Sequence, residues 1–118
     1  MSHSSQDVHK KLLGKAGEKR VEKYLKQQGC IILARNYVTP FGEADLVVQD
    51  KDEVVFVEVK TRLTDSYGAP REAVRADKQR RYRQIAHYYW LQTGEEPNAR
   101  FDVAEVYQKD IQYYKNAY

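Results

Sequence analysis

The sequence predicts an α/β fold in which helices flank a mixed β-sheet. Two long segments carry apolar residues at three- and four-residue steps, which is typical of helices, and four shorter segments are rich in valine, isoleucine and phenylalanine, which is typical of strands. These segments follow one another as helix, three strands, helix, strand. Both faces of the two central strands carry apolar side chains, which indicates a sheet covered on both sides.

Length and composition indicate one globular domain over residues 1–118, of which 42% are hydrophobic and 31% charged. We expect residues 1–7 to be flexible and residues 108–118 to form a C-terminal tail. No apolar run approaches the ~20 residues of a membrane span, so we expect no membrane association. The single cysteine, Cys30, cannot form an intrachain disulfide, which favours the reducing cytoplasm.

The first helix is predicted over residues 8–28, because apolar residues recur on one face and Gly29 follows as a C-terminal stop. Glu18 borders that inward face, where an acid is either a buried hydrogen-bonding residue or a carboxylate that reaches a functional site. A strand over residues 30–37 follows, and the proline and glycine within residues 39–42 predict a turn after it.

The next two strands are predicted over residues 45–49 and 54–61, which are rich in valine and phenylalanine. The charged residues 50–53 between them predict either a four-residue or a two-residue loop. Both loops give one register, in which Asp45 faces Glu58 with their Cβ atoms roughly 4.5–5.5 Å apart.

Two carboxylates at that spacing repel one another, and apolar neighbours would strengthen the repulsion. A raised pKa, a salt bridge or a divalent cation would each relieve it. Lys60 lies on the same face and opposite Glu43 in this register. Two interpretations stay open: a solvated strand in which Lys60 bridges Glu43 or Glu58, or a metal site in which Asp45 and Glu58 are hard oxygen ligands and Lys60 lies beside the substrate.

The second helix is predicted from Pro70, which fits a first helical turn, to about Gln92, with Gly94 and Pro97 ending it. Residues 100–107 alternate in character and predict the last strand.

The net charge of +3 is distributed unevenly. Residues 10–28 carry seven Lys and Arg against two acids, residues 71–83 carry six against two, and residues 43–58 carry six acids against one base. Two basic helices around an acidic centre suit a phosphate backbone that approaches a cation site, whereas ordinary solubilising surface is the alternative. The candidates for contacts with nucleic acid around the second helix are Arg71, Arg75, Lys78 and Arg81.

Asp45, followed thirteen residues later by Glu58-Val59-Lys60, resembles the PD-(D/E)xK signature of the restriction-endonuclease-like superfamily. Ala44 rather than proline precedes Asp45, a departure found among members of that superfamily. Residues 13–107 also resemble the YraN family of small bacterial proteins, through an ordered set of stretches: Gly17-Glu18, Arg35-Asn36, Gly42-Glu43-Ala44-Asp45-Leu46, Phe56-Val57-Glu58-Val59-Lys60-Thr61-Arg62, Gly68 with Pro70, Lys78, and Arg100-Phe101-Asp102.

The resemblance implies a restriction-endonuclease-like αβββαβ core and a nuclease that depends on Mg²⁺ or Mn²⁺. Asp45, Glu58 and the carbonyl of Val59 would then bind the metal, and Glu18 would complete or orient the site through water. Lys60 would position or deprotonate the attacking water and stabilise the developing negative charge. Arg62, at the end of a matched stretch, joins the candidates for nucleic-acid contact.

The layout is also similar to that of archaeal Holliday junction resolvases, which implies structure-selective cleavage of branched nucleic acid, with DNA favoured over RNA. The alternative is a nucleic-acid-binding module on the same fold with little or no turnover. A homodimer would decide whether one strand or two is cut, because it would pair two sites.

Overall fold

A five-stranded sheet forms the centre of the structure, and its strands lie side by side in the order in which they occur along the chain. The computed structural model describes residues 5–63 and 75–117, with side chains described for residues 12–63 and 76–117. The elements are α1 (Ser5–Gln27), β1 (Ile31–Thr39), β2 (Gly42–Asp50), β3 (Glu53–Thr61), α2 (Arg75–Thr93), β4 (Ala99–Tyr107) and β5 (Asp110–Tyr114). The predicted α/β fold class and its αβββαβ order are confirmed.

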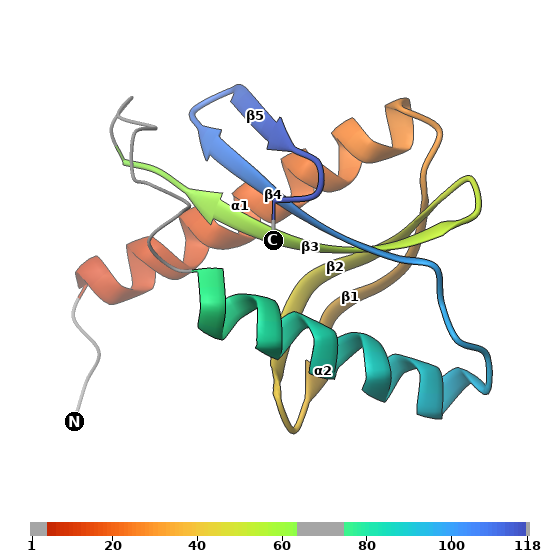
Figure 1. The fold of residues 1–118 in the computed structure, drawn as a ribbon. Helices are drawn as coiled ribbons and strands as arrows, with labels where there is room; N and C mark the ends of the chain where they lie inside the picture. The colour runs from red at the N-terminus through yellow and green to blue at the C-terminus, as the bar shows by residue number, and fades with distance from the viewer. Residues whose placement is uncertain (1–4, 64–74, 118) are drawn as a thin grey trace.

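The sheet is mixed, because β3 pairs antiparallel with β2 but parallel with β4. A parallel pair needs a crossover connection, and α2 lies in the connection between these two strands. Figure 1 shows α1 across one face of the sheet and α2 across the other, so both faces are covered as the apolar pattern predicted.

Each face of the sheet has its own apolar core. On the α1 side, Val21 and Leu25 pack with residues from β2, β3 and β4 that include Leu46 and Val57. On the α2 side, Tyr82 and Ile85 pack with a second set: Ala44, Val47, Phe56 and Ala86. On β3, Val55 and Val57 enter the α1-side core and Phe56 enters the α2-side core, as the period of a strand requires. On β2 this alternation is interrupted at Asp45, because Ala44 and Leu46 enter opposite cores.

The predicted register of the β2–β3 hairpin is confirmed, since Val47 pairs with Phe56 and Asp50 pairs with Glu53. Of the two loops that the sequence allowed, the two-residue loop is observed, and Lys51 adopts the left-handed φ of 58° within it. The ladder between these strands ends at the pair Leu46–Val57. Asp45 and Glu58 are the next residues beyond that last pair.

The helices begin and end close to their predicted bounds. Helix α1 begins before the predicted residue 8 and ends at Gln27, and α2 ends at Thr93. The predicted start of the second helix at Pro70 lies outside the described residues, as do the first four residues of the predicted flexible segment 1–7. Within the described part of the chain, no helix has the length and apolar character that crossing a membrane requires.

Part of the predicted C-terminal tail, Asp110–Tyr114, is a strand. β5 pairs antiparallel with β4, from Tyr107–Asp110 to Val103–Tyr114. Tyr113 packs on the α1-side core and lies against Tyr24, with ring centroids 5.6 Å apart. The alternation of apolar and polar residues from Ile111 is too short to predict a strand by itself. The segment is a strand because it pairs with β4.

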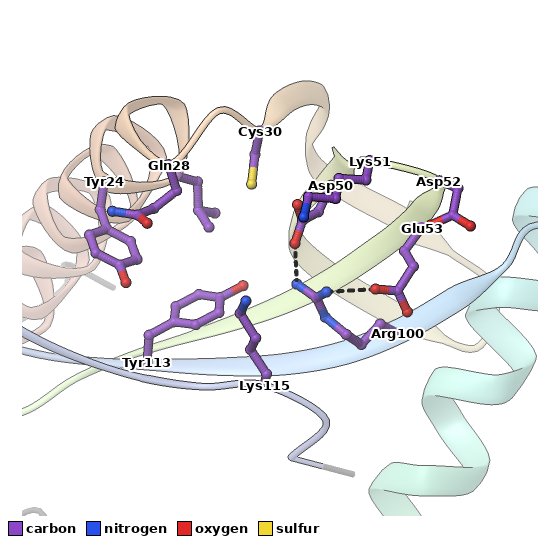
Figure 2. Close-up of a pocket in the computed structure, with 11 residues that line it drawn as sticks. Tyr24, Gln28, Cys30, Asp50, Lys51, Asp52, Glu53, Arg100, Tyr113 and Lys115 are labelled. Atoms are coloured by element: carbon purple, nitrogen blue, oxygen red, sulfur yellow. Dashed lines mark hydrogen bonds and ion pairs between the residues drawn. The ribbon is translucent and has the colours of Figure 1, made fainter.

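A buried arginine joins β4 to the hairpin and to the C-terminal residues. Arg100 is only 6% exposed and contacts the carboxylates of Asp102 at 3.0 Å, Asp50 at 3.0 Å and Glu53 at 2.8 Å. Figure 2 shows Arg100 reaching Asp50 and Glu53 at the edge of a cavity of about 390 Å³. This cluster lies at the hairpin end of β2 and β3, away from Asp45.

Asp102 is the acceptor at the centre of this cluster. It is fully buried and accepts hydrogen bonds from the Tyr113 hydroxyl at 2.6 Å and from the Asn116 backbone N–H at 3.0 Å. Burial, together with the negative charge of Asp102, raises the pKa of Tyr113, so its hydroxyl stays a donor at neutral pH. The C-terminal residues are therefore held on β4 by polar as well as backbone contacts.

Replacing Asp102 with alanine should lower the free energy of unfolding by about 3 kcal/mol, because Arg100 and Tyr113 would remain buried with a lost partner. Urea unfolding measures this change. The control is Asp77→Ala, which removes an exposed contact with Arg80 at 3.6 Å and should cost less than about 0.5 kcal/mol. Equal effects of the two substitutions would contradict the structural role of Asp102.

Candidate active site

Asp45 lies where β2 separates from β3. The ladder has ended one pair earlier, and the Asp45 carboxylate accepts the Val59 backbone N–H at 2.8 Å through its Oδ2 atom. Burial raises the pKa of Asp45, the bond from Val59 lowers it, and the nearby charges of Glu43 and Glu58 raise it further. Asp45 is therefore held by the Val59 N–H and lies near two acids and one base, Lys15, so a bound cation would relieve the remaining repulsion.

Glu58 is held by a lysine from α2. The Lys78 Nζ atom donates to both carboxylate oxygens of Glu58, at 3.0 and 2.8 Å, and both side chains are about four-fifths buried, with 19% and 22% exposed. In one of the two interpretations that the sequence left open, Lys60 bridges Glu43 or Glu58, whereas the ion pair observed at Glu58 is formed by Lys78. Lys78 reaches Glu58 because α2 crosses this face of the sheet, a long-range contact.

Lys60 lies two residues beyond Glu58 on the same face of β3. Burial lowers its pKa, the charge of Glu58 raises it, and the charges of Lys78 and Arg62 lower it. The predicted pairing of Glu43 with Lys60 is not observed, because the ladder between β2 and β3 ends at Leu46–Val57. Lys60 is thus a half-buried amine beside Glu58 and a second lysine.

Glu18 approaches the same region from α1. Burial raises its pKa, Asp45 raises it further, and Lys15 lowers it, so Asp45 and Glu18 lie close enough to interact. Gly17 allows this approach, because a Cβ atom at that position would collide with the Thr61 hydroxyl on β3. Glu18 therefore reaches the edge of the site from α1, whereas Lys78 reaches it from α2 on the other face of the sheet.

The basic residues predicted to contact nucleic acid differ in their surroundings. The Arg62 guanidinium lies 3.4 Å from the fully buried carboxylate of Glu105 on β4. Lys78 contacts Glu58 as described above, and Arg81 is exposed on α2 with its Cδ atom packed near Gly42. Arg71 lies outside the described residues, as does the side chain of Arg75.

Two ion-pair partners were missed by the sequence analysis, Glu105 for Arg62 and Lys78 for Glu58. Glu105 interrupts the apolar run of β4, which is the signal that could have identified it as a buried acid with a basic partner. Its Oε2 atom has no hydrogen-bond partner among the described residues. The pairing of Lys78 with Glu58 left no such signal, since a lysine on a helix is ordinarily solvated.

The carboxylates present fit a magnesium or manganese ion that is completed by substrate. Among the residues described, no group of three or more His, Cys, Asp or Glu side chains could hold a metal by itself. Mg²⁺ commonly takes one or two carboxylates and fills its other positions with water and substrate phosphate. Asp45 and Glu58 supply that number, provided that Lys78 releases at least one oxygen of Glu58.

Comparison with known proteins gives a match over most of the chain. Residues 17–106 match the model of a family described as uncharacterised protein family UPF0102. A UPF0102 protein of Desulfosudis oleivorans is 44% identical over 108 residues, 89% of this chain and 88% of that protein. One from Caldicellulosiruptor saccharolyticus is 39% identical over 119 residues, 94% of this chain and 100% of that protein. The crystal structure of SSO0001 aligns with a TM-score of 0.45 and 15% identity, over 91% of this chain and 52% of that one, about half its length.

Substituting Gly17 with alanine should lower the free energy of unfolding by about 1–3 kcal/mol, because the new Cβ atom would push α1 off β3 at Thr61. The matched control is Gly14→Ala in the same helix, where no atom lies within 4 Å of an added Cβ. That control should stabilise α1 by about 0.5–1 kcal/mol. Thermal unfolding checks both, and the addition of Thr61→Ala should restore most of the loss at residue 17. A loss that persists in the double variant would contradict this close approach.

Proposed function

The chain belongs to the YraN family, described as uncharacterised protein family UPF0102, and we propose that it is an endonuclease that depends on Mg²⁺ or Mn²⁺ and hydrolyses phosphodiester bonds. The observation that carries the proposal is the meeting of two carboxylates and an amine where β2 separates from β3. Asp45 and Glu58 supply the carboxylates, and Lys60 supplies the amine.

Each residue has a distinct role in this proposal. A divalent cation held by Asp45, Glu58 and the Val59 carbonyl would offset charge on the scissile phosphate and make water more acidic. Asp45 is kept in one orientation by the Val59 N–H, which leaves its other oxygen for a ligand. Glu18 orients the site through water from the α1 side.

In this proposal Lys60 is the group that accepts the proton of the attacking water. Its amine lies beside Glu58 and is half-buried, so it can position the attacking water, accept a proton from it, and stabilise the negative charge that develops on the phosphate. Lys78 changes partner in this scheme: it gives up Glu58 and donates to a phosphate oxygen instead, which keeps its charge compensated.

The proposed substrate is DNA in preference to RNA, with branched DNA as the preferred form. The exposed cations on α1 and α2 suit a phosphate backbone that passes over the site. A homodimer would present two such sites to one duplex and allow paired cuts. The buried free thiol of Cys30 is compatible with the reducing cytoplasm, the compartment that we propose for this activity.

One observation favours a second candidate function, a nucleic-acid-binding module with little turnover. Lys78 already satisfies both oxygens of Glu58 without any metal. In that case the carboxylate pair would be structural, and binding would depend on the basic helices and weaken steeply with salt.

Titration of the protein with Mn²⁺ by calorimetry should show one site per chain, and Asp45→Asn should abolish it. Lys78→Gln should tighten binding by about three- to tenfold, because Glu58 would no longer be neutralised by an ammonium group. Asp77→Asn, which changes an exposed acid on the same helix, is the control and should leave the affinity unchanged.

The titration is repeated with a non-cleavable DNA present, so that substrate phosphate can complete the site. Absence of binding under both conditions, for wild type and Lys78→Gln alike, would exclude the proposed metal site.

Cleavage assays with Mn²⁺ on labelled flap, junction, single-stranded and RNA substrates test the activity itself. We expect cleavage of branched DNA, with the rate lowered at least about 100-fold in Glu58→Gln because a metal ligand is lost. Asp77→Asn, purified in the same way, should cleave as wild type does. Activity that survives in Glu58→Gln would reject Glu58 as a metal ligand.

A further inference from the structure

A second cleft lies along α2, on the side of the helix that faces the start of β4. It has a volume of about 290 Å³ and is formed by the C-terminal half of α2 together with the residues that lead into β4. Trp90 and His87 line it and pack edge to face, with ring centroids 5.4 Å apart. Phe101 and Pro97 complete its apolar wall, and Arg83 and Glu96 supply its charges.

Trp90 does not serve either core of the sheet. It is half-buried, and it belongs to neither of the two apolar clusters that the described residues form. A large aromatic side chain that is left at the rim of a cleft offers a flat surface to a ligand.

The cleft is continuous with a line of cations on α2. Arg80, Arg83, His87 and Trp90 recur at steps of three and four residues, so they share one side of the helix. Both arginines are exposed, and Arg80 contacts only the exposed Asp77, at 3.6 Å, among the described residues. This side of α2 therefore presents positive charge that leads to an aromatic surface.

The same helix connects the cleft to the candidate active site. Lys78, near the start of α2, contacts Glu58, and Trp90 follows twelve residues later. At 1.5 Å per residue the two positions are about 18 Å apart, which about five nucleotides of a stacked strand would span.

The chemistry of the cleft favours a nucleobase over a bare phosphate. Glu96 on its lining would repel a phosphate, whereas its carboxylate can accept an N–H from the edge of a base. Trp90 offers its ring for stacking, and Arg83 lies where the phosphate of the same nucleotide could pair with it.

We propose that the cleft at Trp90 binds one base of an unpaired strand of nucleic acid, while Arg83 and Arg80 contact the phosphates that lead from it toward Glu58. The inference rests on the proposed function for the identity of the polymer. It deepens that function, because a strand held unpaired beside the site would give selectivity for flaps and junctions over intact duplex.

The experiment uses Trp90 as its own reporter, since it is the only tryptophan in the chain. Its fluorescence, excited where tyrosine does not absorb, is followed while a single-stranded oligothymidylate of about twelve nucleotides is added in the presence of a chelator. We expect saturable quenching that weakens as salt is raised. An abasic oligonucleotide of the same length should quench at least about threefold less.

Arg83→Gln should weaken the apparent affinity by about three- to tenfold. Lys109→Gln, which removes an exposed cation from the turn between β4 and β5, is the matched control and should change it less than about twofold. Absence of quenching, equal quenching by the abasic oligonucleotide, or equal effects of the two substitutions would overturn the proposal. Quenching by a proline-rich peptide but not by the oligonucleotide would also overturn it and would assign the cleft to a protein partner.

Asp45→Asn separates this inference from the proposed function. If Asp45→Asn still shows quenching by the oligonucleotide, the base subsite does not depend on the metal site. If the wild type then shows neither cleavage nor metal binding, the nuclease is rejected and the base subsite is kept. Cleavage by the wild type without quenching would keep the nuclease and reject the subsite.

Discussion

The central constraint on this structure is that β3 is paired along both edges and covered on both faces. Its residues therefore alternate between the α1-side core and the α2-side core, and a polar residue on it must find a partner within the protein. Glu58 and Lys60 fall on the α2 side at the end of β3 where β2 has separated. The candidate site exists because pairing ends there, so the Asp45 carboxylate takes the N–H of Val59.

Charge compensation explains why helix α2 matters to the site as well as to the fold. Breaking a partly buried ion pair leaves an uncompensated charge, which is costly, so Glu58 needs Lys78 or another cation at all times. The same helix carries Arg80 and Arg83 on its exposed side. An anionic ligand that takes Lys78 from Glu58 would thus also contact the other cations of α2.

The hairpin end of β2 and β3 has a different balance of charges. There Arg100 is surrounded by acids from the hairpin and from β4, and the residues after β5 return to the same cluster through Asn116. The cluster pairs its charges internally, which suits a structural role. At the separated end of β2 and β3, by contrast, Asp45 lies near Glu43 and Glu58 and forms no ion pair with another described residue, which is why the proposed chemistry is placed there.

The sequence by itself determined the elements whose signals are local. Periods of two and of 3.6 residues set the strands and helices, and the charged residues 50–53 with the apolar pattern set the hairpin register, which brought Asp45 near Glu58. Only the tertiary structure decided which cation meets Glu58, that Arg62 lies against Glu105, and that residues 110–114 are a strand. Those outcomes depend on which helix face and which sheet edge meet, and contacts between residues far apart in the chain leave no periodic signal in a single sequence.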